Sequence, residues 1–168
     1  MSLQELISQN IVMKFEGASL TQIKKRLNLA YAHLNNASEM FKKNPKNDMN
    51  KNLIIYKEVY DAMRIAAEAY LLSKGCKAVK EDHHKQTIKA TADLMKEESL
   101  EKVFIRWDKM RKVRNTIDYD IDTTDVSNQS IEQSLKDAKN LLNKIEFNIE
   151  KKSSQAKLKL FPHTPRQT

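Results

Sequence analysis

The sequence predicts an all-α protein, arranged as an up-and-down bundle of about five helices. The chain of 168 residues contains only two glycines and three prolines, too few for the turns of a sheet protein of this length. Apolar residues recur three and four positions apart in five segments, which is the period of an amphipathic helix. Because the connections between these segments are short, neighbouring helices are expected to run antiparallel.

The first long helix is expected to begin after Ser19. Ser19 and Gln22 have the spacing of a capping box, and an apolar series follows as far as Phe41. Asn44 precedes a proline, which disfavours helical backbone and predicts the end of the helix there. Ahead of this helix, residues 3–13 are expected to add a helical turn or two.

Two further helices are expected over residues 50–74 and 81–96. The first of these has a wide apolar face, and its alanines would allow a neighbouring helix to approach closely. Gly75 follows it directly and is expected to end the helix in the left-handed conformation. The tyrosines of this helix are interpreted as core residues rather than as a platform for stacking bases: Tyr56, Tyr60 and Tyr70.

The fourth and fifth helices are separated by the acidic loop 120–126. The fourth is expected over residues 99–117, with Ser99 as its N-cap. The fifth is expected to start at Ser127 or Asn128. Its predicted core face comprises Ile131, Leu135, Ala138, Leu142, Ile145 and Ile149.

By length the chain is expected to form a single domain. Residues 1–18 are interpreted as a short N-terminal helical extension, residues 19–150 as the bundle, and residues 151–168 as a basic, disordered tail. The tail contains five Lys or Arg residues and no acid, within a formal charge of +8 for the chain. The bundle itself is therefore only mildly basic. The tail either adds non-specific affinity for RNA or is simply a solvated terminus.

The sequence is interpreted as that of a cytoplasmic protein. Cys76 is the only cysteine, so no disulfide can form within the chain, as is usual in a reducing compartment. No run approaches the roughly 18 apolar residues of a membrane span, and residues 1–17 lack the layout of a signal peptide. No membrane partner is expected.

The segment 111–120 is the most informative part of the chain for function. The apolar stripe of the fourth helix continues into Arg111, Arg114 and Asp118, so a face that begins apolar ends ionised. In one interpretation, Arg114 and Asp118 form an ordinary ion pair four residues apart, with Tyr119 packed beside it.

The other interpretation of this segment is an anion site. Arg114 with Asn115 beside it would clamp a phosphate and stabilise charge on a phosphoryl group in transit. Asp118 would orient the arginine, and Tyr119 would hydrogen-bond the substrate. A tyrosine with its ordinary pKa of about 10 is a poor general base at neutral pH.

A second basic segment opens the third helix. His83, His84 and Lys85 are interpreted either as an exposed polar helix start or as contacts to a nucleobase or phosphate. Lys77, in the lysine-rich loop before them, would support such a site. The sequence has no glycine-rich phosphate loop, and none of its four histidines has the spacing of a zinc ligand. No cofactor and no metal are predicted.

Several of these segments together resemble the HEPN superfamily (higher eukaryote and prokaryote nucleotide-binding domains). Residues 60–75 are similar to the second helix of those proteins, and residues 83–85 fit the start of their third helix. Residues 114–119, Arg-Asn-Thr-Ile-Asp-Tyr, resemble their signature region. The resemblance covers about residues 25–147.

The resemblance implies a five-helix bundle that is usually dimeric, with the signature helices facing each other across a two-fold axis. Many members are metal-independent endoribonucleases found as toxins, in phage defence and in RNA processing. Their motif is an arginine followed after four to six residues by a histidine, with a polar residue commonly next to the arginine. Here the matching residues are Arg114 and Asn115, and Tyr119 stands where the shortest form of the motif has histidine.

Three functions are therefore expected as alternatives. The first is an endoribonuclease of toxin or phage-defence type, with Arg114 of both subunits in the cleft of a homodimer. The second is a non-catalytic nucleotide- or RNA-binding subunit that partners a separate protein, such as the nucleotidyltransferase that accompanies some relatives. The third is a dimerisation domain in which Trp107, Arg111 and Arg114 serve only as interface residues.

Overall fold

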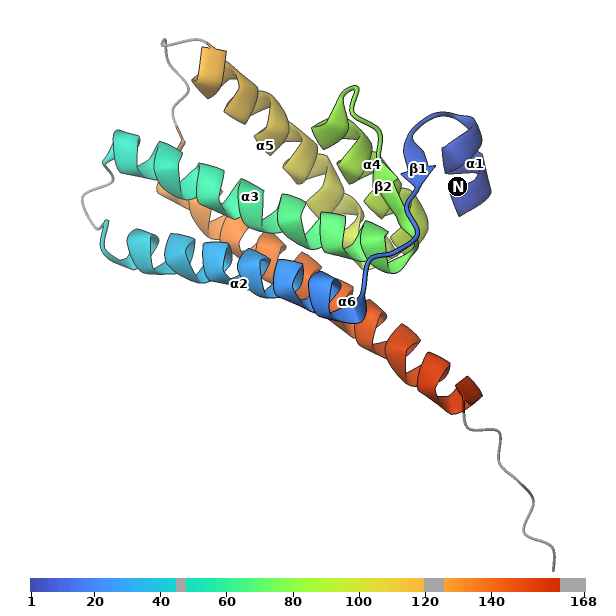
Figure 1. Ribbon diagram of the computed structural model, residues 1–168. Coiled ribbons are helices and arrows are strands. Elements are labelled where there is room, and N and C mark those ends of the chain that lie inside the picture. Colours follow the sequence, from blue (N-terminus) through green and yellow to red (C-terminus); the bar gives the residue numbers. More distant parts are fainter. Residues whose placement is uncertain (45–47, 120–125, 161–168) are drawn as a thin grey trace, which may run out of the picture.

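The computed structural model describes residues 1–44, 48–119 and 126–160, with the backbone alone described for residues 116–119 and 153–160. In these residues, helices form the layers of the molecule, as Figure 1 shows. The predicted all-α bundle is confirmed. The elements in chain order are α1 (Leu3–Ser8), β1 (Val12–Lys14), α2 (Leu20–Lys42), α3 (Met49–Ser73), β2 (Cys76–Ala78), α4 (His83–Met95), the 3-10 helix η1 (Glu98–Leu100), α5 (Glu101–Tyr119) and α6 (Asn128–Leu160).

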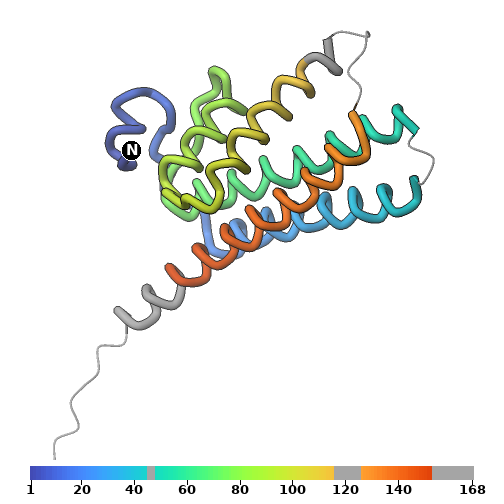
Figure 2. The backbone as a smooth tube through the Cα atoms, turned by 180° about the vertical axis from the view of Figure 1, so that it is seen from behind, coloured from blue at the N-terminus to red at the C-terminus, as the bar shows by residue number. Residues whose placement is uncertain are grey.

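Helix α3 is the centre of the bundle and contacts α2, α4, α5 and α6. Figures 1 and 2 show α2 running antiparallel to α3, α6 packed across this pair, and α4 with α5 near the other side of α3. A helix surrounded in this way must be apolar on most of its circumference. Helix α3 meets that need with small residues that are fully buried: Ala62, Ala66, Ala67 and Ala69.

The helix ends follow the sequence signals closely. The Ser19 hydroxyl accepts a hydrogen bond from the Gln22 amide at 3.2 Å, and the Gln22 side chain accepts one from the Ser19 amide at 2.8 Å, so the predicted capping box is confirmed. Gly75, with φ +78°, supplies the left-handed residue after α3. The Ser127 hydroxyl accepts from the Ser130 amide at 3.2 Å and caps α6.

A small antiparallel sheet was not predicted. Val12 pairs with Ala78 and Lys14 with Cys76, so the N-terminal segment is fastened to the connection between α3 and α4. The expected extra helical turns exist only as α1, and the rest of the segment is extended. Strands of three residues are too short to show an alternating pattern, and their pairing joins distant parts of the chain, so neither has a local signal.

Two helix boundaries differ from those expected. Ser99 lies inside η1 and its hydroxyl bonds Glu97 Oε1 at 3.1 Å, so the interpretation of Ser99 as the cap of the fourth helix was wrong. Helix α6 continues to Leu160, beyond the expected end of the bundle at residue 150. Residues 161–168 of the predicted tail lie outside the described residues.

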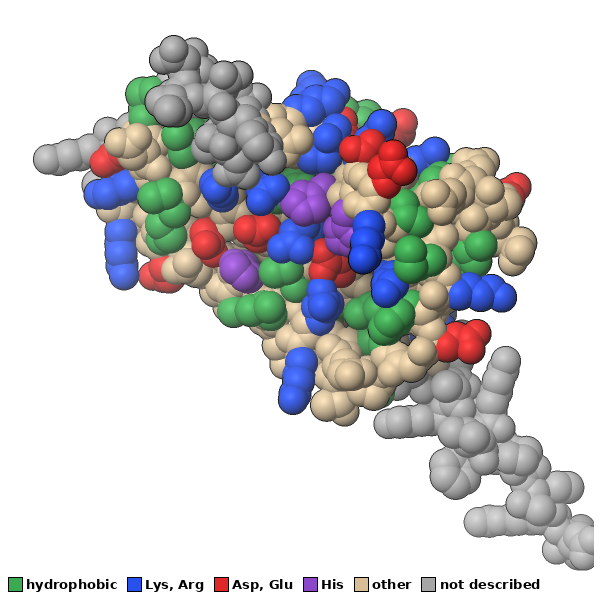
Figure 3. Space-filling view, turned by 45° about the horizontal axis from the view of Figure 1, so that its top comes forward, with side chains coloured by type: hydrophobic (Ala, Val, Ile, Leu, Met, Phe, Trp, Pro, Cys, Tyr) green, Lys and Arg blue, Asp and Glu red, His purple; other side chains and the backbone are tan. Residues whose placement is uncertain are grey.

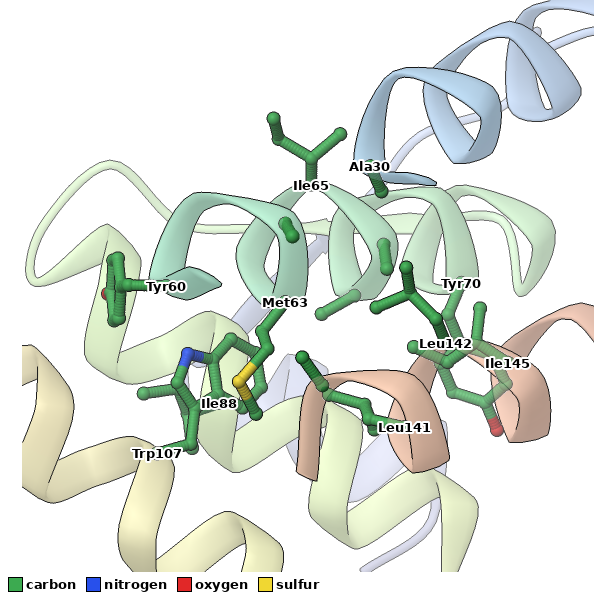
Figure 4. Packing of buried hydrophobic residues seen from close by; sticks show 14 of the residues in the cluster. Ala30, Tyr60, Met63, Ile65, Tyr70, Ile88, Trp107, Leu141, Leu142 and Ile145 are labelled. Carbon is green, nitrogen blue, oxygen red and sulfur yellow. The ribbon is translucent and has the colours of Figure 1, made fainter. Parts of the chain in front are cut away.

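The core lies around α3, where Figure 4 shows Tyr60 and Met63 near Trp107 of α5 and Leu141 of α6. All four side chains have no exposed surface. The predicted core face of α6 is confirmed, with Leu135 only partly buried. No helix among the described residues is both long and apolar enough to cross a membrane.

Candidate functional site

Three helices bring Arg114, His84 and Tyr60 together. Nδ1 of His84, in the first turn of α4, lies 3.4 Å from a terminal guanidinium nitrogen of Arg114, near the end of α5. The guanidinium carbon of Arg114 lies 5.6 Å from the ring centre of Tyr60 on α3. The rings of Tyr60 and His84 are 5.8 Å apart. We call these three residues the Arg114 cluster.

The start of α4 determines where His84 lies. Strand β2 ends at Ala78, and Asp82 then adopts a left-handed conformation with φ +49° immediately before the helix. Helix α4 then packs on α3 and α5, and the His84 ring lies beside Tyr60 of α3 and Arg114 of α5.

The surroundings of His84 favour its neutral form. Burial lowers the pKa of His84, and the nearby charges of Arg64 and Arg114 lower it further. Because a guanidinium group only donates hydrogen bonds, Nδ1 of a neutral His84 is the acceptor for Arg114 and Nε2 carries the proton. The histidine therefore has a lone pair available for a proton as soon as Arg114 turns to another acceptor.

Tyr60 contributes a buried hydroxyl to the same place. Its side chain has no exposed surface, and its Oη has no hydrogen-bond partner among the described residues. Burial raises the pKa of Tyr60 to about 12, so the phenol stays protonated and can only donate to an anion. Trp107 lies 6.4 Å from Tyr60 between ring centres, and its Nε1 also lacks a partner within the described part of the chain.

Sequence reasoning interpreted Tyr60 only as a core residue. That interpretation is correct for its burial, but it missed the contact with Arg114 and His84. Tyr60 lies at helical spacing among alanines, and nothing local distinguishes it from Tyr56 or Tyr70. Only the packing of α4 and α5 against α3 identifies it as a site residue.

A second charged group adjoins the Arg114 cluster. Arg64 binds Glu68 at 2.7 Å and Asp61 at 3.2 Å, all three on α3. The other oxygen of Glu68 pairs with Arg26 of α2. Burial lowers the pKa of Arg64, but the carboxylates of Glu68 and Asp61 more than offset this and raise it. The spacing of Asp61, Arg64 and Glu68 could have revealed their ion pairs, whereas Arg26 has no such signal.

The other residues predicted from segment 111–120 are less closely involved. Arg111 is mostly buried and bonds Asp108 of its own helix at 2.8 Å. Asn115 is exposed. The side chains of Asp118 and Tyr119 lie outside the described residues, so their predicted roles remain predictions.

The basic residues near α4 divide into two sets. The ring of His83 lies 5.9 Å from that of His84, and His83 with Lys77 lines an open groove. Lys85 is exposed and lies apart from that lining. Figure 3 shows histidine, basic and acidic side chains gathered near the middle of one face.

The groove runs between α2, α3 and the small sheet and has a volume of about 800 Å³. We call it the α2–α3 groove. Its lining is part basic and part apolar, and it shares Arg64 and His83 with the surroundings of the Arg114 cluster. The charged and histidine lining residues are Lys25, Arg26, Arg64, Glu68, Lys77 and His83.

Comparisons with known proteins assign no family. The chain matches no model of a known protein family, and it matches no curated protein. Among the described residues, no group of three or more His, Cys, Asp or Glu side chains is arranged to hold a metal ion.

Proposed function

We propose that the protein is an RNA-directed, metal-independent endoribonuclease in which Arg114 and His84 act on one phosphate. The observation that carries the proposal is the 3.4 Å approach of the two side chains from different helices. An arginine that stabilises phosphoryl charge beside a neutral imidazole is a pairing suited to proton transfer at a phosphate ester. The resemblance of segment 114–119 to the HEPN signature supports the same substrate class.

In the proposed reaction, a phosphate of the RNA draws the guanidinium of Arg114 away from His84. Nδ1 of His84 then accepts the proton of the neighbouring ribose 2′-hydroxyl, and the 2′-oxygen attacks phosphorus. The bond from phosphorus to the 5′-oxygen breaks, that oxygen takes a proton from water, and His84 returns its proton to the hydroxide so formed. The products are a 2′,3′-cyclic phosphate and a 5′-hydroxyl end. Arg114 stabilises the additional negative charge in the transition state.

The pairing of His84 with Arg114 offers an explanation for Tyr119 at the place where the motif has histidine. HEPN nucleases place a histidine a few residues after the arginine, and this chain has tyrosine in the shortest such position. In the proposal, His84 from α4 supplies the imidazole from another part of the chain. Asn115, Asp118 and Tyr119 are proposed to position the RNA, with a second copy of the chain contributing its own Arg114 across a dimer cleft.

The alternative is a non-catalytic RNA- or nucleotide-binding subunit that works with a separate protein, such as a nucleotidyltransferase. The size and basic lining of the α2–α3 groove favour this alternative, because they suit binding and require no turnover. A toxin or phage-defence role is compatible with either function.

The test is incubation of end-labelled single-stranded RNA with the protein in EDTA, beside a DNA oligonucleotide of the same sequence. Wild type is expected to cleave the RNA and leave the DNA intact, since DNA has no 2′-hydroxyl. Arg114→Ala and His84→Gln are expected to reduce the rate at least 100-fold. Lys102→Ala is the matched control, because it removes an exposed cation from the same helix about 18 Å away along its axis.

Full activity in Arg114→Ala would remove the proposed role of this residue. Intact RNA with wild type, together with measurable RNA binding, would favour the binding subunit. Light scattering of the same samples reports whether the active species is a dimer. If Arg114→Ala changes the mass of the assembly rather than the rate of cleavage, the residue belongs to an interface between subunits.

A further inference from the structure

We propose that the α2–α3 groove holds the nucleotides that flank the phosphate bound at the Arg114 cluster, as unpaired bases of a single-stranded RNA. The inference rests on the proposed function in one respect, namely that the ligand of the cluster is RNA. It adds a second binding site, its position and the strandedness of the substrate.

Position is the first support. Arg64 lines the groove, and its charge acts on both His84 and Tyr60: it adds to the lowering of the pKa of His84 and partly offsets the rise that burial causes in the pKa of Tyr60. His83 also lines the groove, with its ring 5.9 Å from that of His84. The groove therefore begins where the Arg114 cluster ends, as needed for consecutive nucleotides of one strand.

Charge is the second support. Four lining residues are permanent cations, and Glu68 is the only acid among the lining residues that the structure describes. Glu68 is shared by Arg26 and Arg64, and Arg64 also pairs with Asp61, so the excess of positive charge comes from Lys25 and Lys77. The excess of positive charge suits a polyanion. Lys77 Nζ lies 4.6 Å from the ring centre of Phe15, which places a cation at the edge of the groove.

The apolar part of the groove lining indicates that the bound RNA strand is unpaired. Phe15, Ile65 and Leu72 line the groove, and Leu29 beside them is 51% exposed although it is a large apolar side chain. Faces of unpaired bases pack on such surfaces, whereas in a duplex these faces are stacked within the helix. A volume of about 800 Å³ falls within the usual range for small-ligand sites and suits one or two nucleotides, not a double helix.

The experiment measures binding apart from cleavage. A fluorescent 2′-O-methyl RNA of 12 nucleotides cannot be cleaved by attack of a 2′-hydroxyl, and anisotropy reports its affinity at several salt concentrations. Lys25→Ala/Lys77→Ala is expected to weaken binding roughly ten-fold at 0.1 M salt and to flatten the salt dependence. Lys24→Ala/Lys139→Ala is the matched control, because these two lysines are exposed and outside the groove lining. Its affinity should stay within two-fold of wild type.

A second variant tests the contact with bases. Leu29→Ser changes no charge, and it is expected to weaken binding of the 2′-O-methyl strand by about three- to ten-fold, as loss of part of a stacking surface does. The same variant should bind an abasic strand of equal length with wild-type affinity. An equal loss for both strands, or none for either, would contradict the base contact.

The outcomes separate the two proposals. Groove-dependent binding without cleavage of ordinary RNA would retain the groove and reject the nuclease. Cleavage of ordinary RNA together with unchanged affinity in the groove variants would retain the nuclease and reject the groove. Equal losses in groove and control variants, no binding by wild type, stronger binding of the matching duplex, or equally tight binding of a poly-glutamate peptide would each overturn the groove proposal.

Discussion

His84 and Arg114 are 30 positions apart in the chain, yet Nδ1 of the histidine lies 3.4 Å from a guanidinium nitrogen of the arginine. A cation beside an imidazole opposes protonation of the ring, and burial acts in the same direction. The neutral imidazole and the permanent cation therefore coexist at one place near neutral pH.

Acidification is expected to destabilise the protein through His84. Its pKa is lowered in the folded state by burial and by Arg64, Arg114 and His83, with Glu68 acting in the opposite direction. The unfolded chain thus binds the proton more readily. This contribution to stability is fully present above the unfolded pKa of about 6.5 and is lost as the pH falls below it toward the lower folded value.

Urea unfolding of wild type and His84→Gln between pH 8 and pH 5 measures this effect. The free energy of unfolding of wild type should fall more over that range than that of the variant. The difference between the two proteins at pH 8 serves as the reference. Parallel curves would show that protonation of His84 is not linked to folding.

Tyr60→Phe is expected to separate stability from RNA binding. The hydroxyl that it removes is buried without a partner among the described residues, so the free energy of unfolding should stay constant or rise by up to about 1 kcal/mol. RNA affinity should fall, because a donor near Arg114 is lost. Tyr31→Phe should instead lower the free energy of unfolding and leave RNA affinity unchanged, since that hydroxyl donates to Glu146 at 2.8 Å, away from the Arg114 cluster. Identical changes in unfolding free energy and in RNA anisotropy for the two variants would contradict the placement of the Tyr60 hydroxyl at the RNA site.

Glu68→Gln is expected to weaken the fold and strengthen RNA binding. The change leaves two guanidinium groups without their shared carboxylate, at a cost of about 1–2 kcal/mol because Arg26 is partly exposed. It also makes the groove more positive, so affinity should rise and depend more steeply on salt. Glu132→Gln is the control, since its pair with Lys136 is exposed and its loss should change stability by less than roughly 0.5 kcal/mol. Weaker RNA binding by Glu68→Gln would contradict the role given to the groove.

Asn52→Ala tests a polar link at one end of the bundle, where the start of α3 meets the residues that follow α2 and precede α6. The Asn52 side chain donates to the carbonyl of Val126 and accepts from Asn44, both at 2.8 Å, and it has no exposed surface. Its removal is expected to cost about 1–3 kcal/mol in urea unfolding, with RNA affinity unchanged under native conditions. Asn140→Ala, at an exposed position of α6, should have no such cost. A loss below about 0.5 kcal/mol would show that water replaces the link.

The helices and most of their ends could be predicted from the sequence because these depend on neighbours along the chain. The spacing of Ser19 and Gln22, the position of Gly75 and the apolar period of α6 are local signals, and the structure confirms each of them. Ser99 was misassigned because a serine suited to an N-cap can equally sit within a 3-10 turn, and the flanking backbone decides between them.

Part of the candidate site could be predicted from the sequence, and the rest became apparent only in the tertiary structure. The sequence by itself determined that an apolar face ends in Arg111 and Arg114, and that His83 and His84 open a helix. Only the packing of α4 and α5 on α3 decided that His84 meets Arg114 above the ring of Tyr60. The physical reason is that helical periodicity determines which face a residue occupies, whereas the angle and offset at which helices pack determine which faces meet.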